Sequence, residues 1–192
     1  MEDVIGRLLN EVGKGRAVAL ASLVWSTGSI PMSDSAKMFV TESGRIVGTI
    51  GGGCLEAEVF AAGQSVLKSG EPSYMRYTMT EKQAGENGLN CGGTVRIYTE
   101  RIDAAEGGEA FAMIEKAKVH REPRIMVTEL NGTRRYIADE EGKIIWAKGD
   151  RPVGISEEIA GVKFNNREGG TILGTPEGGG EFFVEPFWPQ PC

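Results

Sequence analysis

The sequence feature that most constrains this chain is a glycine triplet, Gly51 to Gly53, placed between an apolar run and a helical pattern. The apolar run Ile46–Ile50 has the character of a strand, and the helical pattern begins at Cys54. Three consecutive glycines give the backbone easy access to φ > 0 and leave no side chain over the N–H groups that start a helix. The stretch predicts either a loop that binds an anion through backbone N–H groups or a tight turn that needs glycine only to pack.

The composition predicts a globular protein with many special backbone positions. Of the 192 residues 40% are hydrophobic and 25% are charged, and the 28 glycines are about twice the usual share. The net charge of −6 argues against nucleic acid as a partner, because phosphate binding needs clustered Lys and Arg. No apolar run approaches the roughly 20 residues of a membrane span, and the N-terminus lacks the pattern of a signal peptide. We therefore expect a cytoplasmic protein that binds neither nucleic acid nor a membrane.

The periodicity of the chain predicts the fold class α/β (α+β), with a mixed β-sheet, helices packed on it, and glycine loops that converge at one rim. Helices are expected at Val4–Val12, from Cys54 to the stop at Gly70, at Ala110–Lys118 and after a cap at Ser156. Strands are expected at Ala17–Trp25, Lys37–Thr41, Ile46–Ile50, Pro72–Met79, Thr94–Glu100, Arg124–Leu130, Arg134–Ala138, Lys143–Ala147 and Glu181–Pro186.

A change of composition at Asp103–Gly108 divides the chain into residues 1–102 and 103–192. The second segment is also expected to be α+β, with the turn signal Asn131-Gly132 between two of its strands. The sequence leaves open whether this segment folds separately or continues the first.

The common nucleotide-binding patterns are excluded at the glycine triplet. A Walker A loop needs Lys followed by Ser or Thr after the glycines, and none follows here. A Rossmann fingerprint that starts at Gly51 needs glycine at position 56, where Glu56 stands. Glu56 has two interpretations, which are capping of the helix N-terminus and hydrogen bonding to the N–H donors of a heterocycle.

The cysteines predict thiol chemistry at most, because Cys54, Cys91 and Cys192 fit neither a disulfide framework nor a zinc site. Cys54 is either a thiol activated by the helix N-terminus or a small buried hydrophobe. Cys91 comes before two glycines and is the better candidate for a reactive thiol near a thiophilic centre. His120 is the only histidine and lies in a polar context, so we predict no catalytic residue and no metal site built by side chains.

Four separated blocks resemble, in order and spacing, the N-terminal domain of the XdhC/CoxI family of xanthine dehydrogenase accessory proteins. The blocks are Thr27–Pro31, Ala36–Met38, Gly48–Glu56 and Cys91–Gly93. Met32 and Ser35 depart from the family pattern, where a basic residue and a glycine are expected. This weakens the case for an anion bound by side-chain charge in the first loop and leaves Lys37 to supply such a charge.

The resemblance implies a chaperone more than an enzyme, one that binds the molybdenum cofactor (molybdopterin) transiently and helps to insert it into a molybdenum hydroxylase apoenzyme. A cysteine desulfurase and a second copy of the chain are further candidate partners. From the loop chemistry we expect Gly51–Gly53 to meet the phosphate, Glu56 the heterocycle, and Cys91 the metal or its sulfur. The candidate cofactor-binding residues are Gly28, Ser29, Pro31, Lys37, Gly51, Gly52, Gly53, Cys54, Glu56, Cys91, Gly92 and Gly93.

The C-terminal stretch Phe182–Cys192 is similar to the segment that leads into a Rossmann domain in longer family members. The protein is therefore expected to be either a stand-alone short form or a fragment. The apolar, proline-rich end favours the fragment, in which this stretch is a linker to a domain that the sequence does not include. Two alternative functions stay open. One is the non-nucleotide half of a nicotinamide-dependent oxidoreductase, and the other is a protein-interaction scaffold for a hydroxylase and a sulfur donor.

Overall fold

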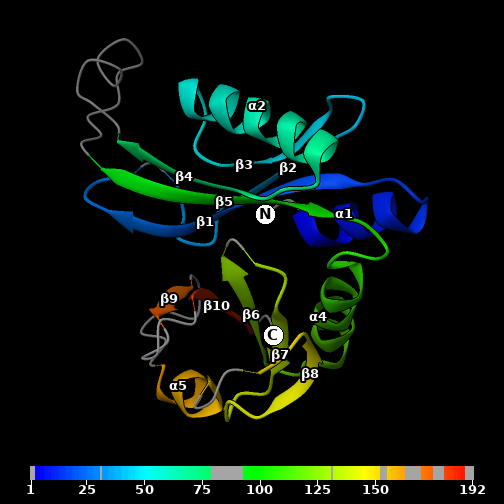
Figure 1. The fold of residues 1–192 in the computed structure, drawn as a ribbon, viewed down its shortest axis with the longest axis vertical. Coiled ribbons are helices and arrows are strands. Elements are labelled where there is room, and N and C mark those ends of the chain that lie inside the picture. The colour runs from blue at the N-terminus through cyan, green and yellow to red at the C-terminus, as the bar shows by residue number, and fades with distance from the viewer. Residues whose placement is uncertain are drawn as a thin grey trace. The chain divides into compact units, whose positions relative to one another are not determined.

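The computed structural model describes residues 3–30, 32–78, 93–130, 132–151, 155–162, 170–174 and 180–188. The chain divides into two compact units, Met1–Glu106 and Gly107–Cys192. Each unit contains one five-stranded antiparallel sheet and its own helices (Figure 1). The α+β class is confirmed, while the strands form two antiparallel sheets and not one mixed sheet. Short hairpins join many neighbouring strands, and a hairpin can only pair its strands antiparallel.

The first unit has the strand order β3-β2-β1-β5-β4. Every helix and strand expected here is confirmed to within two residues at the ends that were predicted. The helix α1 begins after Asp3, whose side chain accepts a hydrogen bond from the N–H of Gly6 at 3.1 Å. The elements are α1 (Val4–Gly13), β1 (Val18–Thr27), β2 (Lys37–Thr41), β3 (Ile46–Thr49), α2 (Cys54–Ser69), β4 (Ser73–Thr78) and β5 (Thr94–Ile102).

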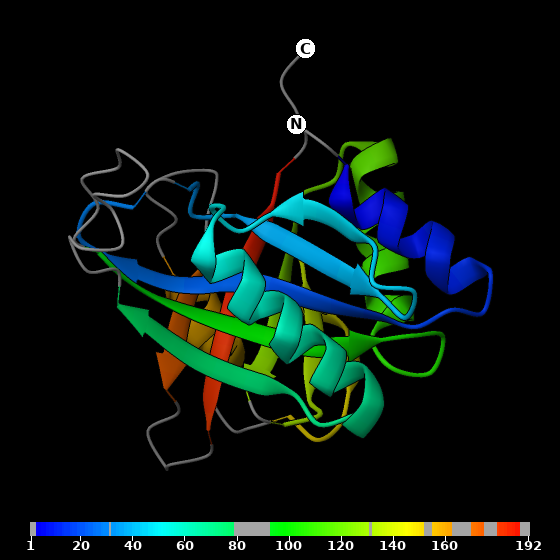
Figure 2. The same cartoon turned by 90° about the horizontal axis from the view of Figure 1, so that it is seen from above.

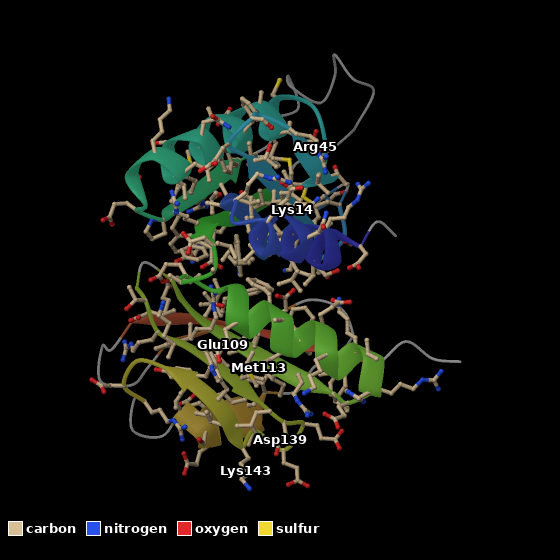
Figure 3. All side chains as sticks on the ribbon, turned by 90° about the vertical axis from the view of Figure 1, so that its right-hand side faces the viewer. Lys14, Arg45, Glu109, Met113, Asp139 and Lys143 are labelled. Carbon is tan, nitrogen blue, oxygen red and sulfur yellow. The ribbon has the colours of Figure 1, made fainter. Side chains whose placement is uncertain are left out.

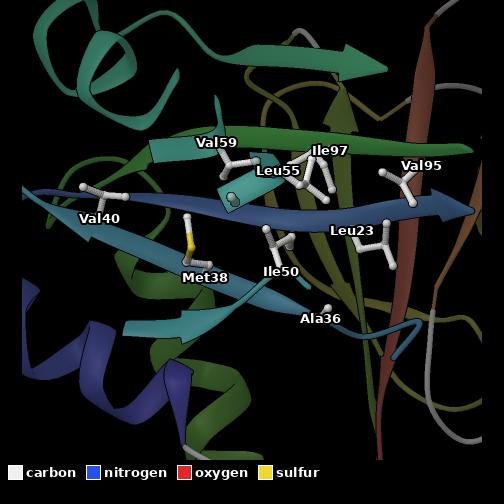
Figure 4. Close-up of a cluster of buried hydrophobic side chains, with 10 residues drawn as sticks. Leu23, Ala36, Met38, Val40, Ile50, Leu55, Val59, Val95 and Ile97 are labelled. Atoms are coloured by element: carbon white, nitrogen blue, oxygen red, sulfur yellow. The ribbon is translucent and has the colours of Figure 1, made fainter. Parts of the chain in front are cut away.

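A hydrophobic core cluster of the first unit lies between its sheet and α2, which lies over the sheet (Figure 2). Leu55 and Val59 of α2 pack with Met38 and Val40 of β2 and with Ile97 of β5 (Figure 4). Fully burying one such side chain stabilises the fold by about 1.5–3 kcal/mol. The helix ends where expected, at Gly70 in the left-handed conformation. This packing holds the first turn of α2, and the glycine triplet before it, at one end of the sheet.

The second unit has the strand order β8-β7-β6-β10-β9. The expected strands are confirmed, and a further strand, β9, was not predicted. The turn residue Asn131 lies outside the described residues, and α5 begins at Ile155, so Ser156 lies inside the helix and is not its cap. The elements are α4 (Gly108–His120), β6 (Arg124–Leu130), β7 (Arg135–Ala138), β8 (Ile144–Lys148), α5 (Ile155–Gly161), β9 (Thr171–Gly174) and β10 (Glu181–Phe187).

The second core packs side chains of the sheet against α5, with Tyr136 and Phe182 fully buried. The hydroxyl of Tyr136 donates a hydrogen bond to the backbone oxygen of Asp150 at 2.5 Å, which satisfies the polar end of a buried ring. The carboxylate of Asp139 accepts the N–H groups of Glu141 and Lys143 and so shapes the turn between β7 and β8 (Figure 3). No described helix is long and apolar enough to cross a membrane.

Candidate functional site

The predicted glycine loops lie at one end of the sheet of the first unit. At this end β1 finishes with Thr27, which pairs with Thr94 at the start of β5. At the same end β3 finishes with Thr49, which pairs with Lys37 at the start of β2. The loop after β1, the glycine triplet after β3 and Gly93 before β5 therefore share one rim.

The loops at this rim are in contact. A Cβ added at Gly93 would lie 2.8 Å from the backbone oxygen of Ser29 and 2.9 Å from that of Thr27, so only glycine allows this approach. A Cβ added at Gly51 would lie 2.1 Å from Cε of Met32, which covers it. Met32 also packs against the core cluster below. The expected convergence of glycine loops at one rim is confirmed for the described residues.

The glycine triplet is held by a hydrogen-bond network around Glu56 in the first turn of α2. Its Oε1 accepts hydrogen bonds from the Thr49 hydroxyl at 2.6 Å, the N–H of Gly52 at 3.1 Å and the N–H of Ile50 at 3.3 Å. The Thr49 hydroxyl oxygen in turn accepts the N–H of Gly51 at 3.2 Å. Two of the three N–H groups in the triplet are therefore engaged within the chain. Among the described residues, Oε2 of Glu56 accepts no hydrogen bond.

The backbone of the triplet requires glycine. Gly51, Gly52 and Gly53 have φ of +116°, +81° and +65°, in the range that side-chain-bearing residues rarely adopt. Among the described residues, nothing lies within 4 Å of a Cβ built at Gly52 or Gly53, so the described part of the chain leaves the loop open above these two residues. Gly53 is the N-cap of α2 and has no side chain to bond the first N–H groups of the helix. The loop thus combines an uncapped helix N-terminus, which favours anions, with the carboxylate of Glu56, which opposes them.

Comparison with known proteins bears on this same segment. The model of the XdhC and CoxI family matches residues 12–78. Residues 12–78 are thus similar to this family. The match contains the loop after β1 and the glycine triplet with Glu56, and it confirms for this segment the resemblance drawn from the sequence blocks.

The fold has a solved relative. The chain is similar to a protein from Bacillus halodurans described as a xanthine dehydrogenase, with a TM-score of 0.69 and 20% identity over 99% of this chain and 54% of that one. It is also 38% identical over 80 residues to the uncharacterized protein YqeB of Escherichia coli (strain K12), covering 42% of this chain and 15% of that protein. The chain thus spans about half of the solved protein's length, and the structural likeness shows a shared fold.

The remaining candidate residues within residues 12–78 lie in different places in the structure. Cys54 is exposed at the start of α2, so its interpretation as a buried small hydrophobe is wrong. Lys37 is 9% exposed and lies in β2. Met38 next to it packs against α2, so strand alternation puts the Lys37 side chain on the other face of the sheet. Gly28 has a φ of +77° directly after β1.

Three candidate residues, Pro31, Cys91 and Gly92, lie outside the described residues, so their roles stay predictions. Within the described part of the chain, no group of three or more His, Cys, Asp or Glu side chains is arranged to hold a metal ion.

Two residues that shape the rim were missed by the sequence interpretation. Met32 was noted only as a departure from the family pattern, yet its methyl group covers Gly51. Thr49 was not considered, yet it bonds both Glu56 and Gly51. A hydroxyl residue directly before a strand-to-helix loop is a signal that points to such local bonding, because Thr readily hydrogen-bonds nearby backbone N–H groups.

A further cluster, also missed, lies on the other face of the same sheet. The Arg96 guanidinium carbon is 5.0 Å from the ring centre of Trp25, and its Nη1 donates to the hydroxyl of Tyr74 at 3.3 Å. Since Val95 and Ile97 pack in the core beneath α2, Arg96 between them points away from that helix. The cluster is therefore separate from the glycine rim.

Proposed function

We propose that this chain is a molybdenum cofactor-binding accessory protein that assists the maturation of a xanthine dehydrogenase-type molybdenum hydroxylase. The family match and the solved relative support a coarser statement, an accessory role in such maturation. Binding of the cofactor is the further step. The observation that supports cofactor binding is the rim at which the loop after β1, the glycine triplet and Gly93 meet. The first two of these lie within residues 12–78, which the family model matches.

The chemistry of the rim fits a ligand that has both an anionic group and a heterocycle. The uncapped start of α2 favours an anionic group, and the space that the described residues leave over Gly52 and Gly53 lets a group approach the backbone closely. Glu56 provides a carboxylate acceptor for ring N–H groups. Gly28, Ser29 and Gly93 complete the rim, and Cys54 adds an exposed thiol. In this proposal Pro31, Cys91 and Gly92 belong to the same site on the strength of the sequence. Lys37 does not, because its side chain lies on the other face of the sheet.

The proposal includes a set of partners and a location. The cofactor is cargo that passes to a hydroxylase apoenzyme, and a cysteine desulfurase supplies its sulfur. The protein acts in the cytoplasm and forms a homodimer. Pull-down of the apoenzyme and of the desulfurase with and without cofactor tests the partners, and it also tests the alternative of a scaffold that needs no cofactor.

Co-elution of molybdenum with protein purified from a cofactor-producing host tests the central step. Gly52→Asp and Cys91→Ala are the site variants, and Gly70→Asp is the matched control. Gly52 and Gly70 have similar φ, +81° and +77°, and neither has an atom of the described residues within 4 Å of a built Cβ, but Gly70 lies at the opposite end of α2. Loss of molybdenum in the site variants with retention in the control is expected. Full retention in all three refutes the site.

One observation keeps an oxidoreductase role as the second candidate. The chain spans only 54% of a protein described as a xanthine dehydrogenase. Under this alternative the chain is the non-nucleotide half of an enzyme that uses a nicotinamide cofactor. Xanthine oxidation with a nicotinamide acceptor by the full-length protein supports this alternative, and cofactor binding without turnover removes it.

A further inference from the structure

The Thr49 and Glu56 side chains form a hydrogen-bonded pair that also bonds the backbone of the glycine triplet. Their side chains are joined by the 2.6 Å hydrogen bond, the shortest of the network, between the Thr49 hydroxyl and Oε1 of Glu56. The Thr49 hydroxyl oxygen accepts a hydrogen bond from the N–H of Gly51, and the Glu56 carboxylate accepts one from the N–H of Gly52. Two adjacent N–H groups of the loop are thereby turned toward the pair.

The contacts of Glu56 differ from those of an ordinary helix cap. In a capping box the carboxylate at the third helical position accepts the N–H of the N-cap residue. Here the N-cap is Gly53, and the three donors to Glu56 are Thr49, Ile50 and Gly52, all earlier in the chain. The hydrogen bonds therefore hold the loop before the helix, and the first N–H groups of α2 gain nothing from them.

The pair also determines which kind of group the loop offers to a ligand. The N–H groups of Gly51 and Gly52 already donate hydrogen bonds within the chain. Among the described residues, Oε2 of Glu56 accepts no hydrogen bond and is available to a ligand. A phosphate approaching this point meets a fixed negative charge and must break the existing bonds. A ring edge that carries N–H groups meets an acceptor that is already oriented.

We propose that Thr49 and Glu56 are the positioning and specificity-determining pair of the cofactor site, and that the loop they hold receives the N–H-bearing edge of the pterin ring and not its phosphate. The inference rests on the proposed function, because it concerns the same ligand. It replaces the expectation that Gly51–Gly53 meet the phosphate, and it assigns Thr49, which has no role in that expectation, as the residue that orients Glu56.

The test uses two probes, pterin without a phosphate group and inorganic phosphate, titrated into the full chain by calorimetry. The variants are Thr49→Val, which keeps the shape but removes the hydroxyl, Thr49→Ser, which restores it, and Glu56→Gln. Thr78→Val is the control, since Thr78 ends β4 at the same end of the sheet and bonds Thr94 at 3.4 Å instead of the loop.

We expect wild type to bind pterin and inorganic phosphate not to compete. Glu56→Gln and Thr49→Val weaken pterin binding by about tenfold or more, the effect of losing a hydrogen bond to a charged group. Thr49→Ser and Thr78→Val stay within about threefold of wild type, since neither removes that bond. Phosphate that competes with pterin, or equal pterin affinity in Glu56→Gln and wild type, overturns the inference.

Amide hydrogen exchange of Gly51 and Gly52 gives a readout that needs no ligand. Thr49→Val is expected to speed exchange at Gly51, and Glu56→Ala at Gly52, with Thr49→Ser close to wild type. Unchanged exchange in both variants overturns the positioning role. Molybdenum co-elution separates the two proposals. Cofactor binding that Thr49→Val and Glu56→Gln leave undiminished refutes the inference alone, and absence of both cofactor and pterin binding in wild type refutes the proposed function with it.

Discussion

Replacing Gly51 with alanine tests whether the loop after β1 rests on the glycine triplet. The new Cβ would lie 2.1 Å from Cε of Met32, where carbon atoms in contact are about 3.5–4.0 Å apart, so the methyl group must move by roughly 1.5 Å. This crowding costs about 1 kcal/mol, the low end for overpacking, because methionine is flexible. Alanine at a φ of +116° costs a further ~1–3 kcal/mol in backbone strain. We expect Gly51→Ala to lower the free energy of unfolding by about 2–4 kcal/mol.

A double-mutant cycle with Met32→Ala separates the two costs. Once Met32 is shortened, Gly51→Ala retains the backbone strain but loses the crowding, so the cycle should show a coupling of about 1 kcal/mol. Urea unfolding is followed by the fluorescence of Trp25, which lies in β1, after Trp146 and Trp188 of the second unit are changed to phenylalanine. The midpoint shifts at constant slope give the free energies.

Gly52→Ala is the control for this cycle. It has a φ of +81° and no atom of the described part of the chain within 4 Å of its built Cβ, so it carries strain without crowding and should not couple to Met32→Ala. Additivity of Gly51→Ala and Met32→Ala within ~0.5 kcal/mol would refute the packing of one loop on the other. Coupling of the same size between Gly52→Ala and Met32→Ala would show that the coupling does not come from contact of Met32 with the residue at position 51.

Three further predictions concern the packing of each unit. Val59→Ala, at a fully buried position of α2, should cost about 1–3 kcal/mol in the same fluorescence assay, and a change below ~0.5 kcal/mol contradicts the assigned packing. Tyr136→Phe removes the hydrogen bond to Asp150 and should cost about 0.5–1.5 kcal/mol by calorimetry of thermal unfolding, whereas a gain in stability is incompatible with that bond. The hydrogen bond and charge of Arg134, 2.5 Å away, hold the pKa of Glu129 below its ordinary value. The Glu129 carboxylate therefore stabilises the fold above about pH 4.3, its ordinary value, and this contribution is lost as the pH falls through the lowered pKa. The stability difference between wild type and Glu129→Gln should shrink from about pH 5 downward, and a difference that is independent of pH argues against the pair.

The helices and strands were predictable because their signals are local. The helical spacing from Leu55 to Leu67 and the stop at Gly70 describe α2 without reference to any other part of the chain. A nearly continuous apolar run such as that of β1 is typical of a strand buried on both faces, and residues 18–24 are buried. The strand β9, only four residues long and half-buried, has too little alternation for a pattern to stand out.

The sequence predicted where the candidate site lies in the fold, but it did not predict which residues contact one another there. The glycines of three loops could be assigned to one rim, because strands that lead into or out of glycine suggest a shared sheet edge. The role of Glu56 could not be decided, since capping and ligand binding require the same residue at the same position. Its actual partners, Thr49, Ile50 and Gly52, depend on how far the loop folds back over the first turn of α2.

The sequence by itself determined which segments are helix and strand, that the turn into α2 needs glycine, and that no common nucleotide motif is present. These follow from the spacing of apolar residues and from backbone conformations open to glycine alone. Only the tertiary structure decided that β1 pairs with β5, about 70 residues later in the chain, and that Gly93 therefore stands against Thr27 and Ser29. Strand partners far apart in sequence are chosen by the packing of the whole sheet, which no local pattern contains.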